Sequence, residues 1–399
     1  MDLSQKLDVP VSLGRHFLQL PGPNPVPERV QRAMSAAVID HRGPEFRDLA
    51  LNVLAGIRGV FRTTGPVVIY PSSGTGAWEA SIVNTLSPGD EVLMCETGHF
   101  AMLWAKMATK WGLKVHNIPT DWRHGADAAE IEARLRQDST GAIKAVMIVH
   151  NETSTGVTSA IAEIRKAIDA AGHGALFMVD TISSLGSVEF NHDDWGVDVA
   201  ICCSQKGLML PPGLGFTAVS QKALAASKRN ATPRSYWDWA EMIKFNEDGF
   251  FPYTPATTLL YGLRESIAML NEEGLDAVFE RHRLLARAAR AAVEAWGFET
   301  VCQDPALHSP VLTAIMMPDG HDADRFRAVA LDNYNISLGS GLSKLAGKAF
   351  RIGHLGECSA PTLLGALGVV ELALGLANVP HRPGGLGAAL DTFRVTGAA

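Results

Sequence analysis

Residues 175–207 read ALFMVDTISSLGSVEFNHDDWGVDVAICCSQKG and contain two short apolar runs that each end in polar residues. The first run, ALFMV, is followed by Asp180, and the second, VDVAICC, is followed by Ser204, Gln205 and Lys206. Runs of this kind predict buried parallel strands, whose carboxyl ends lie at one edge of a sheet. The stretch therefore predicts an α/β fold in which Asp180 and Lys206 face the same crevice.

Asp180 and Lys206 in this relation suit pyridoxal phosphate. A lysine amine forms a Schiff base with the cofactor's aldehyde, and a carboxylate beside the pyridine nitrogen keeps the ring protonated, so that it accepts electrons from a substrate carbanion. The alternative is a strand-end Asp that caps the following turn and a Lys that is exposed on a loop. The neighbouring sequence favours the cofactor.

A loop of small residues follows an earlier predicted strand in VVIYPSSGTGAWEASIVNTL and opens a predicted helix. Its residues are Ser72, Ser73, Gly74, Thr75 and Gly76. Backbone N–H groups and hydroxyls at a helix start favour a phosphate. The loop is neither GxGxxG nor a P-loop, and a Gly/Ser turn before a helix is often only a turn, so both interpretations stay open.

The segment VDTISSLGS followed by SQKGLMLPPGLGF resembles the class V, fold type I aminotransferases, most closely the serine-glyoxylate and alanine-glyoxylate branch. The resemblance runs from GPNPVP near residue 22 to FRIGHLG, which ends at Gly356. It implies an α/β large domain with a mostly parallel seven-stranded sheet and a smaller α+β C-terminal domain. The predicted division is an N-terminal arm over residues 1–25, a pyridoxal phosphate-binding domain over 26–257 and a small domain over 258–399.

The resemblance also implies roles for individual residues. Lys206 would bond to the cofactor, Asp180 would face the ring nitrogen, and Phe100 would stack on the ring. The other implied cofactor contacts are Ser73, Gly74, Thr75 and Gln205 at the phosphate, Thr153 at the ring oxygen, and Ile182. Trp is the more familiar stacking residue in the alanine branch, so Phe100 is a departure, and His99 and Trp104 are neighbouring alternatives.

Residues 229–256 are rich in aromatic residues, which suggests an interface. In the family, the counterpart of YTP reaches across a dimer to the phosphate of the neighbouring subunit. The matching hydroxyl is that of Thr254, with Tyr253 as a second candidate. The resemblance thus implies a homodimer with shared active sites.

Two arginines are candidates for binding the substrate. Arg351, in FRIGHLG, matches the family's carboxylate-binding arginine, and its planar guanidinium suits bidentate recognition of a carboxylate. An inter-strand salt bridge is the alternative role. Arg42, in HRGPEF, could meet a second carboxylate, although a salt bridge at a helix edge is the simpler interpretation.

The predicted reaction moves an amino group from a small L-amino acid to glyoxylate, giving glycine and a 2-oxo acid. Serine is the preferred donor, which would give hydroxypyruvate, and alanine and aspartate are alternatives. An aspartate donor would require a second cation, for which Arg42 is the candidate. A desulfurase-like lyase that uses Cys358, or a non-catalytic interaction module, fits the sequence less well.

The composition narrows the class of protein. The chain of 399 residues has 47% hydrophobic and 19% charged residues and a net charge of -7, which predicts a globular protein without a basic surface for nucleic acid. The five cysteines have no spacing that predicts a metal site or a disulfide framework, so a reduced, cytoplasmic protein is expected. The N-terminus does not resemble a signal peptide, and the apolar stretch from Leu363 contains Glu371 and is too short to span a membrane.

Overall fold

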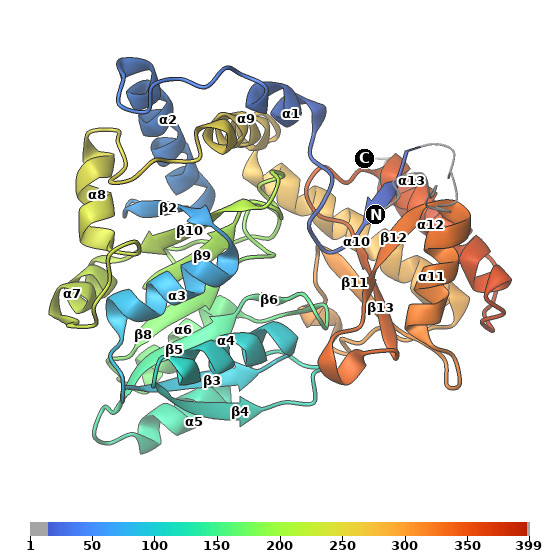
Figure 1. Ribbon diagram of the computed structural model, residues 1–399. Coiled ribbons are helices and arrows are strands. Elements are labelled where there is room, and N and C mark those ends of the chain that lie inside the picture. Colours follow the sequence, from blue (N-terminus) through green and yellow to red (C-terminus); the bar gives the residue numbers. More distant parts are fainter. Residues whose placement is uncertain (1–14, 397–399) are drawn as a thin grey trace, which may run out of the picture.

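The computed structural model describes residues 15–396 and is built around a seven-stranded sheet of order β2-β10-β9-β8-β5-β3-β4 (Figure 1). Its strands are β2 (Val67–Ser72), β3 (Glu91–Glu96), β4 (Lys114–Pro119), β5 (Ile143–Val149), β8 (Leu176–Asp180), β9 (Val199–Cys203) and β10 (Gly213–Val219). β10 is antiparallel to both of its neighbours, and the other pairings in this sheet are parallel. The mostly parallel sheet predicted from the sequence is confirmed.

The central strands are buried on both faces, which explains why their sequences are continuous apolar runs. Every residue of β8 and β9 is buried, and in β5 only Lys144 is exposed. The helices of this domain are α2 (Pro44–Phe61), α3 (Gly74–Thr85), α4 (His99–Lys110), α5 (Ala128–Gln137), α6 (Ile161–Ala170), α7 (Gln221–Arg229) and α8 (Trp239–Glu247). The buried residues of α6 recur at helical spacing, as a helix that packs on a sheet requires.

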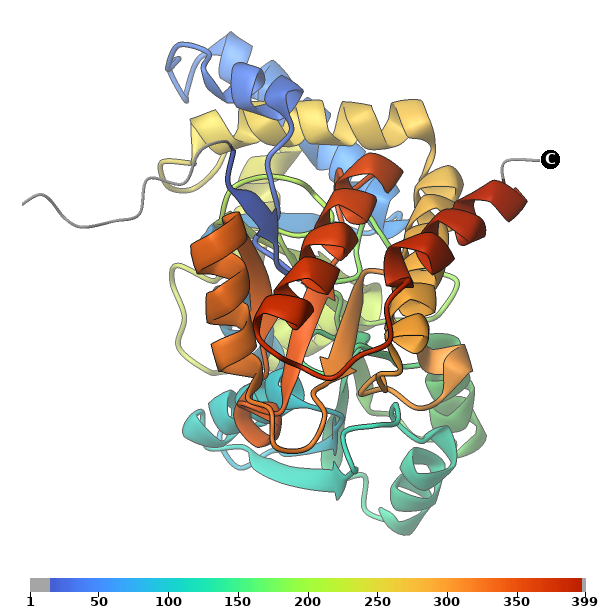
Figure 2. The same ribbon diagram turned by 90° about the vertical axis from the view of Figure 1, so that its right-hand side faces the viewer.

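A four-stranded sheet of order β1-β12-β13-β11 forms the second layer, at the right of Figure 1. Its strands are β1 (Phe17–Gln19), β11 (Leu312–Met316), β12 (Ile336–Ser340) and β13 (Ala349–Gly353). The helices on this side are α10 (Leu275–Trp296), α11 (Ala323–Tyr334), α12 (Ala360–Leu376) and α13 (Gly385–Thr396). Figure 2 shows α11, α12 and α13, in orange to red, in front of the small sheet.

The N-terminal arm connects the two sheets. Of residues 1–25, the first fourteen lie outside the described residues, and β1 pairs in parallel with β12 at the edge of the small sheet. The proline-rich segment after β1 then leads to α1 (Glu28–Met34), which packs with α2 against α9 (Thr257–Glu273). The arm therefore passes between the two layers, on the side where β8 and β9 end.

The remaining elements are short: the strands β6 (Asn151–Glu152) and β7 (Val157–Thr158), and two 3-10 helices, η1 (Pro305–Leu307) and η2 (Ser343–Leu345). Among the helices of residues 15–396, none has both the length and the apolar character that a membrane crossing needs. Glu371 in α12 accepts hydrogen bonds from Trp296 and from the backbone at the start of α13.

Candidate active site

A cavity of about 180 Å³ lies at the carboxyl ends of the central strands. Because β5, β8 and β9 are parallel neighbours, the residues that follow them meet at one edge of the sheet. The predicted cofactor residues that line the cavity are Ser73, Gly74, Thr75, Phe100, Thr153, Asp180, Ile182, Gln205 and Lys206. Residues 15–396 contain no group of three or more His, Cys, Asp or Glu side chains that could hold a metal ion.

Asp180 ends β8 with its carboxylate held by two donors. The indole N–H of Trp78 donates to Oδ2 at 3.0 Å, and the backbone N–H of Ile182 donates to Oδ1 at 2.6 Å. Burial raises the pKa of Asp180 to about 7, and the nearby charge of Glu152 acts in the same direction, whereas the two donors lower it. The carboxylate is thus oriented and poised to pair with a cation.

Lys206 is buried, and its amine faces the N-terminal arm. Nζ donates a hydrogen bond to the carbonyl oxygen of Pro21. Burial lowers the pKa of Lys206 to about 8, and the charge of Arg351 contributes to the decrease. A neutral amine is therefore accessible near neutral pH, which is the form that acts as a nucleophile or a base.

The arm approaches Lys206 closely at Gly22. This residue has φ +98°, and a Cβ atom there would lie 2.3 Å from Cδ of Lys206. Gly22 and Pro23 line the same cavity, so the arm forms one of its walls. Only glycine combines this backbone conformation with the space that the lysine side chain needs.

The start of α3 provides an anion site. Ser73 is the N-cap residue, no side chain caps the first turn of the helix, and Ser73, Gly74 and Thr75 line the cavity. Gln205 lines the same cavity, and its side-chain Oε1 is buried without a hydrogen-bond partner among the described residues. Uncapped amides, an unsatisfied amide group, a buried lysine and an oriented carboxylate fit a phosphorylated pyridine aldehyde.

Aromatic side chains form a further wall of the cavity. Phe100 and Trp78 line it, and Trp78 stacks on Trp104 with ring centroids 5.8 Å apart and an interplanar angle of 11°. Trp104 is fully buried behind Trp78, and His99 instead bonds Ser343 at 2.7 Å. Of the three residues considered for ring stacking, Phe100 is the one that lines the cavity.

Arg351, in β13 of the small domain, lies beside the cavity and contacts its lining residue Thr153. Its Nη1 donates to the carbonyl oxygen of Thr153 at 2.7 Å, and its Nε donates to that of Ser340 at 2.8 Å. Arg351 forms no ion pair with another residue of the described range, so the inter-strand salt bridge is not formed. Burial lowers the pKa of Arg351 to about 10, while the charge of Glu152 raises it. A buried guanidinium without a direct ion-pair partner can accept a carboxylate ligand.

Four predicted site residues do not line this cavity: Arg351, which contacts it through the backbone of Thr153, and Arg42, Tyr253 and Thr254. Arg42 borders a separate cavity of about 430 Å³. Tyr253 is half-buried and stacks on Tyr236 with ring centroids 4.4 Å apart, and Thr254 is exposed. Within one chain, Arg42, Tyr253 and Thr254 therefore do not border the cavity that contains Lys206.

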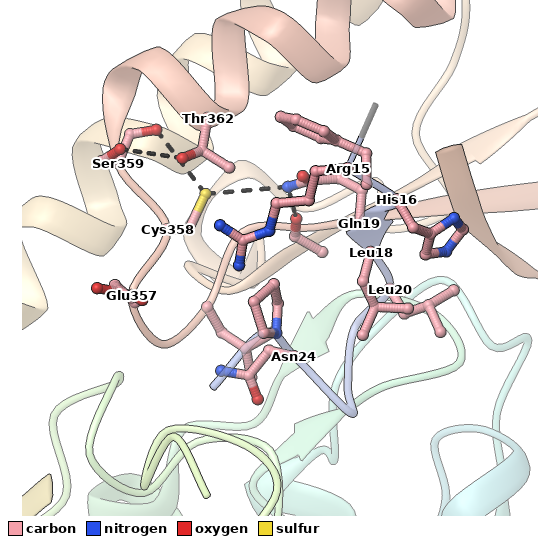
Figure 3. A pocket seen from close by; sticks show the side chains of 14 residues that line it. Arg15, His16, Leu18, Gln19, Leu20, Asn24, Glu357, Cys358, Ser359 and Thr362 are labelled. Carbon is pink, nitrogen blue, oxygen red and sulfur yellow. Dashed lines mark hydrogen bonds between the residues drawn. The ribbon is translucent and has the colours of Figure 1, made fainter. Parts of the chain in front are cut away.

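A larger cavity, of about 550 Å³, lies behind the arm and is drawn in Figure 3. It is lined by residues such as Arg15, Asn24 and Cys358 and contains none of the predicted cofactor residues, so the larger cavity is not the one that contains Lys206 and Asp180. Burial raises the pKa of the Cys358 thiol to about 11, and its Sγ contacts the Gln19 amide at 3.9 Å. A thiolate nucleophile is thus disfavoured at Cys358.

The sequence did not reveal all residues that line the cavity beside Lys206. Trp78, Asn151 and Ser183 line it in addition to the predicted set. Asn151 Nδ2 donates to the Ser183 hydroxyl at 2.8 Å, which links the loops after β5 and β8. Trp78 lies four residues after Gly74, one helical turn into α3, and that spacing was the available signal.

Comparisons with known proteins agree with this geometry. Residues 28–353 match the family model described as Aminotransferase class-V. The chain is 48% identical over 386 residues to a serine-glyoxylate aminotransferase of Methylorubrum extorquens, covering 95% of this chain and 96% of that protein. It is 42% identical over 382 residues to an L-aspartate-glyoxylate aminotransferase of Paracoccus denitrificans, covering 95% and 96%.

The fold is also that of solved aminotransferases. The crystal structure of pyridoxamine-pyruvate aminotransferase from Mesorhizobium loti superposes with a TM-score of 0.89 at 27% identity, covering 95% of this chain and 97% of that chain. The match to the family model extends over most of the chain and includes the cavity residues from Ser73 to Lys206, as well as Arg351. The chain therefore belongs to the class-V aminotransferase family.

Proposed function

We propose that this protein is a pyridoxal phosphate-dependent aminotransferase that moves the amino group of L-serine to glyoxylate, giving hydroxypyruvate and glycine. The observation that carries the proposal is one cavity lined by Lys206, Asp180 and the uncapped start of α3. The names of relatives at 48%, 46% and 42% identity support serine and glyoxylate as substrates.

The cavity residues divide between the parts of the cofactor. Ser73, Gly74, Thr75 and Gln205 would hold the phosphate, Asp180 the ring nitrogen and Phe100 the face of the ring, with Thr153 and Ile182 as further contacts. Bound pyridoxal phosphate supplies an electron sink for the negative charge that develops at the substrate's α-carbon. A cationic ring nitrogen against Asp180 would oppose the effect of burial on that carboxylate.

The protein's own groups position the substrate and move its proton. The guanidinium of Arg351, held by two backbone carbonyls, binds the α-carboxylate and fixes the orientation of the α-carbon. Lys206, with a pKa of about 8, accepts the α-proton at Nζ and then releases a proton as the amino group is transferred. Donor and acceptor use the same cavity in turn, so we expect ping-pong kinetics.

Aspartate is the second candidate donor, because one relative at 42% identity is named for it. Its side-chain carboxylate would require a further cation, and Arg42 borders a different cavity within this chain. Serine is therefore favoured. The Arg42→Ala variant tests the alternative: a loss confined to aspartate would support it, whereas an equal loss with every donor would contradict it.

The active form that we propose is a cytoplasmic homodimer with shared active sites. Thr254 is exposed, and the nearby aromatic side chains of Tyr236 and Phe245 are 41% and 40% exposed. Such a surface suits a subunit contact. The five cysteines are free thiols, which fits a reducing compartment.

If the active sites are shared between subunits, dimers that contain two different impaired subunits should be active. Inactive Lys206→Ala subunits and weakened Thr254→Ala subunits, when mixed after dissociation, should regain activity, because hybrid dimers contain one intact site. Absence of regain in hybrids that are shown to form would exclude a contribution of Thr254 to the neighbouring subunit.

The proposed reaction is tested by steady-state assays with serine, alanine or aspartate as donor and glyoxylate as acceptor. Hydroxypyruvate formed from serine, with the highest kcat/KM of the three donors, supports the proposal. Lys206→Ala should abolish turnover without loss of the folded state. Full turnover in that variant would contradict the central role of Lys206.

A further inference from the structure

Glu152, in β6, is a buried carboxylate whose oxygens are occupied by four donors. Oε1 accepts hydrogen bonds from Ser154 N at 3.0 Å, from Ser154 Oγ at 2.6 Å and from Phe100 N at 3.3 Å. Oε2 accepts a hydrogen bond from Ala101 N at 3.1 Å. The side chain has a relative exposure of 0%, so it has no contact with solvent.

Two of these donors are backbone amides in the first turn of α4 (His99–Lys110), those of Phe100 and Ala101. The N-cap residue of that helix is Gly98, which has no side chain that could cap it. Glu152 thus provides the cap from a distant part of the sequence, and a negative charge at a helix start is favourable. Because Phe100 is one of the two capped residues, Glu152 fixes the backbone from which the Phe100 ring enters the cavity.

The absence of a side chain at position 98 allows this contact. A Cβ atom on Gly98 would lie 2.4 Å from Cγ of Glu152 and 2.5 Å from Oγ of Ser154. The hydroxyl of Ser154 also accepts a hydrogen bond from the backbone N–H of His99 at 2.9 Å. Glu152 and Ser154 therefore hold three consecutive amides, those of His99, Phe100 and Ala101.

The other side of the same loop holds Arg351. The residue after Glu152 is Thr153, whose carbonyl oxygen accepts a hydrogen bond from Nη1 of Arg351. The charge of Glu152 also favours the charged form of Arg351 and opposes the effect of burial on its pKa. One carboxylate thus touches the helix of the ring-stacking residue and supports the carboxylate-binding arginine.

We propose that Glu152 is a positioning residue that fixes Phe100 and Arg351 relative to one another, and so sets the distance between the cofactor ring and the substrate carboxylate. This role rests on the proposed aminotransferase function. Glu152 is not among the residues that line the cavity, and the donors to its oxygens come from the loop that contains it and from the start of α4. It acts through the residues that it holds.

The Glu152→Gln variant tests the role, because it keeps the size of the side chain but removes the charge and one acceptor. Its matched control is Glu371→Gln, which alters a carboxylate that also caps a helix start, but at α13 in the small domain. We expect Glu152→Gln to raise the dissociation constant of pyridoxal phosphate and the KM for serine by about tenfold each. The control should change either value by less than about twofold.

Hydrogen exchange of the apoprotein gives a readout that does not depend on activity. In Glu152→Gln, the amides of Phe100 and Ala101 should exchange faster than in the wild type, whereas in Glu371→Gln the accelerated amides should lie at the start of α13. Ser154→Ala, which removes one donor and keeps the carboxylate, should shift the same amides of α4 by a smaller factor. If Glu152→Gln does not fold, amide exchange in Ser154→Ala tests the positioning role in its place.

The outcomes separate the two proposals. If the wild type binds pyridoxal phosphate and transaminates, but Glu152→Gln behaves like Glu371→Gln in exchange, cofactor binding and KM, the positioning role is overturned. If the wild type itself binds no pyridoxal phosphate, the proposed function is wrong, and Glu152 has no role in positioning groups for catalysis. Faster exchange at α4 together with a raised KM supports the role.

Discussion

Trp78 and Asp180 are joined by a hydrogen bond of 3.0 Å between the indole N–H and a carboxylate oxygen. The bond links α3, whose start is the anion site, to β8, whose end provides the carboxylate. The phosphate and the ring nitrogen of a bound cofactor would therefore contact α3 and β8, and this hydrogen bond fixes the two elements relative to each other. A donor to the ionised form also opposes the effect of burial on Asp180.

Replacement of Trp78 by Phe should shift the pH dependence of catalysis. Loss of the donor raises the pKa of Asp180, so the acidic limb of the kcat/KM profile should move to higher pH by about half a unit to one unit. Trp104→Phe is the control, because the Trp104 indole N–H has no hydrogen-bond partner among the described residues. The same shift in both variants, or none in Trp78→Phe, would contradict this assignment.

The apoprotein should lose stability through Asp180 as the pH rises. Its pKa is about 7 in the folded chain, against an ordinary value of 3.8, so the folded state prefers the protonated form. The contribution is fully present below the ordinary value and is lost as the pH rises through about 7. The free energy of unfolding of wild type relative to Asp180→Asn should fall by about 3 kcal/mol between about pH 5 and pH 8.

Urea unfolding of the two apoproteins across this pH range checks the linkage. A difference between wild type and Asp180→Asn that does not change with pH, or that grows in favour of the wild type at high pH, would rule it out.

Gly22→Ala should displace the side chain of Lys206 and strain the backbone of the arm at residue 22. The new Cβ would lie 2.3 Å from Cδ of Lys206, so the lysine or the arm must move, and kcat/KM should fall at least about tenfold. Gly89→Ala is matched in backbone conformation, with φ +95°, but a Cβ there meets no atom within 4 Å. It should cost only about 1 kcal/mol of stability. Equal activity of the two variants would exclude the close approach as the cause.

Arg351→Lys should raise the KM for every amino donor by about tenfold to a hundredfold, with a smaller effect on kcat. A lysine keeps the charge but cannot bond Thr153, Ser340 and a carboxylate with one planar group. Arg327→Lys is the control, since Arg327 pairs with Asp324 and bonds the carbonyl of Leu338. An unchanged KM in Arg351→Lys would show that the carboxylate binds elsewhere.

The sequence predicted those parts of the fold that have a local signal. β8 and β9 are buried on both faces, so they appear as apolar runs that end in Asp180 and in SQK. β1 and β12 were not predicted. β1 has three residues and pairs with β12, which lies more than three hundred residues later in the chain. Neither strand therefore shows a recognisable alternation of apolar and polar residues in the sequence. The helix α8 lies in the aromatic-rich residues 229–256, for which no helix was predicted.

The site could be predicted where function depends on residue type at a strand end. Trp78 and Glu152 could not, because their importance depends on what their side chains touch: a carboxylate on β8 and two amides of α4. Thr254 and Arg42 stay predictions, since their roles depend on a neighbouring subunit or on a second substrate carboxylate. Such relations arise from tertiary or quaternary contacts and leave no periodic pattern in the chain.

The most direct test of the account is an absorption spectrum of the purified protein, titrated separately with serine, alanine and aspartate without an acceptor. We predict that the wild type has a near-visible absorption band of bound pyridoxal phosphate, which serine bleaches and glyoxylate restores. The Lys206→Ala variant should lack this band. A wild-type protein without such a band, even after incubation with pyridoxal phosphate, would contradict the claim that Lys206 and Asp180 form a cofactor site.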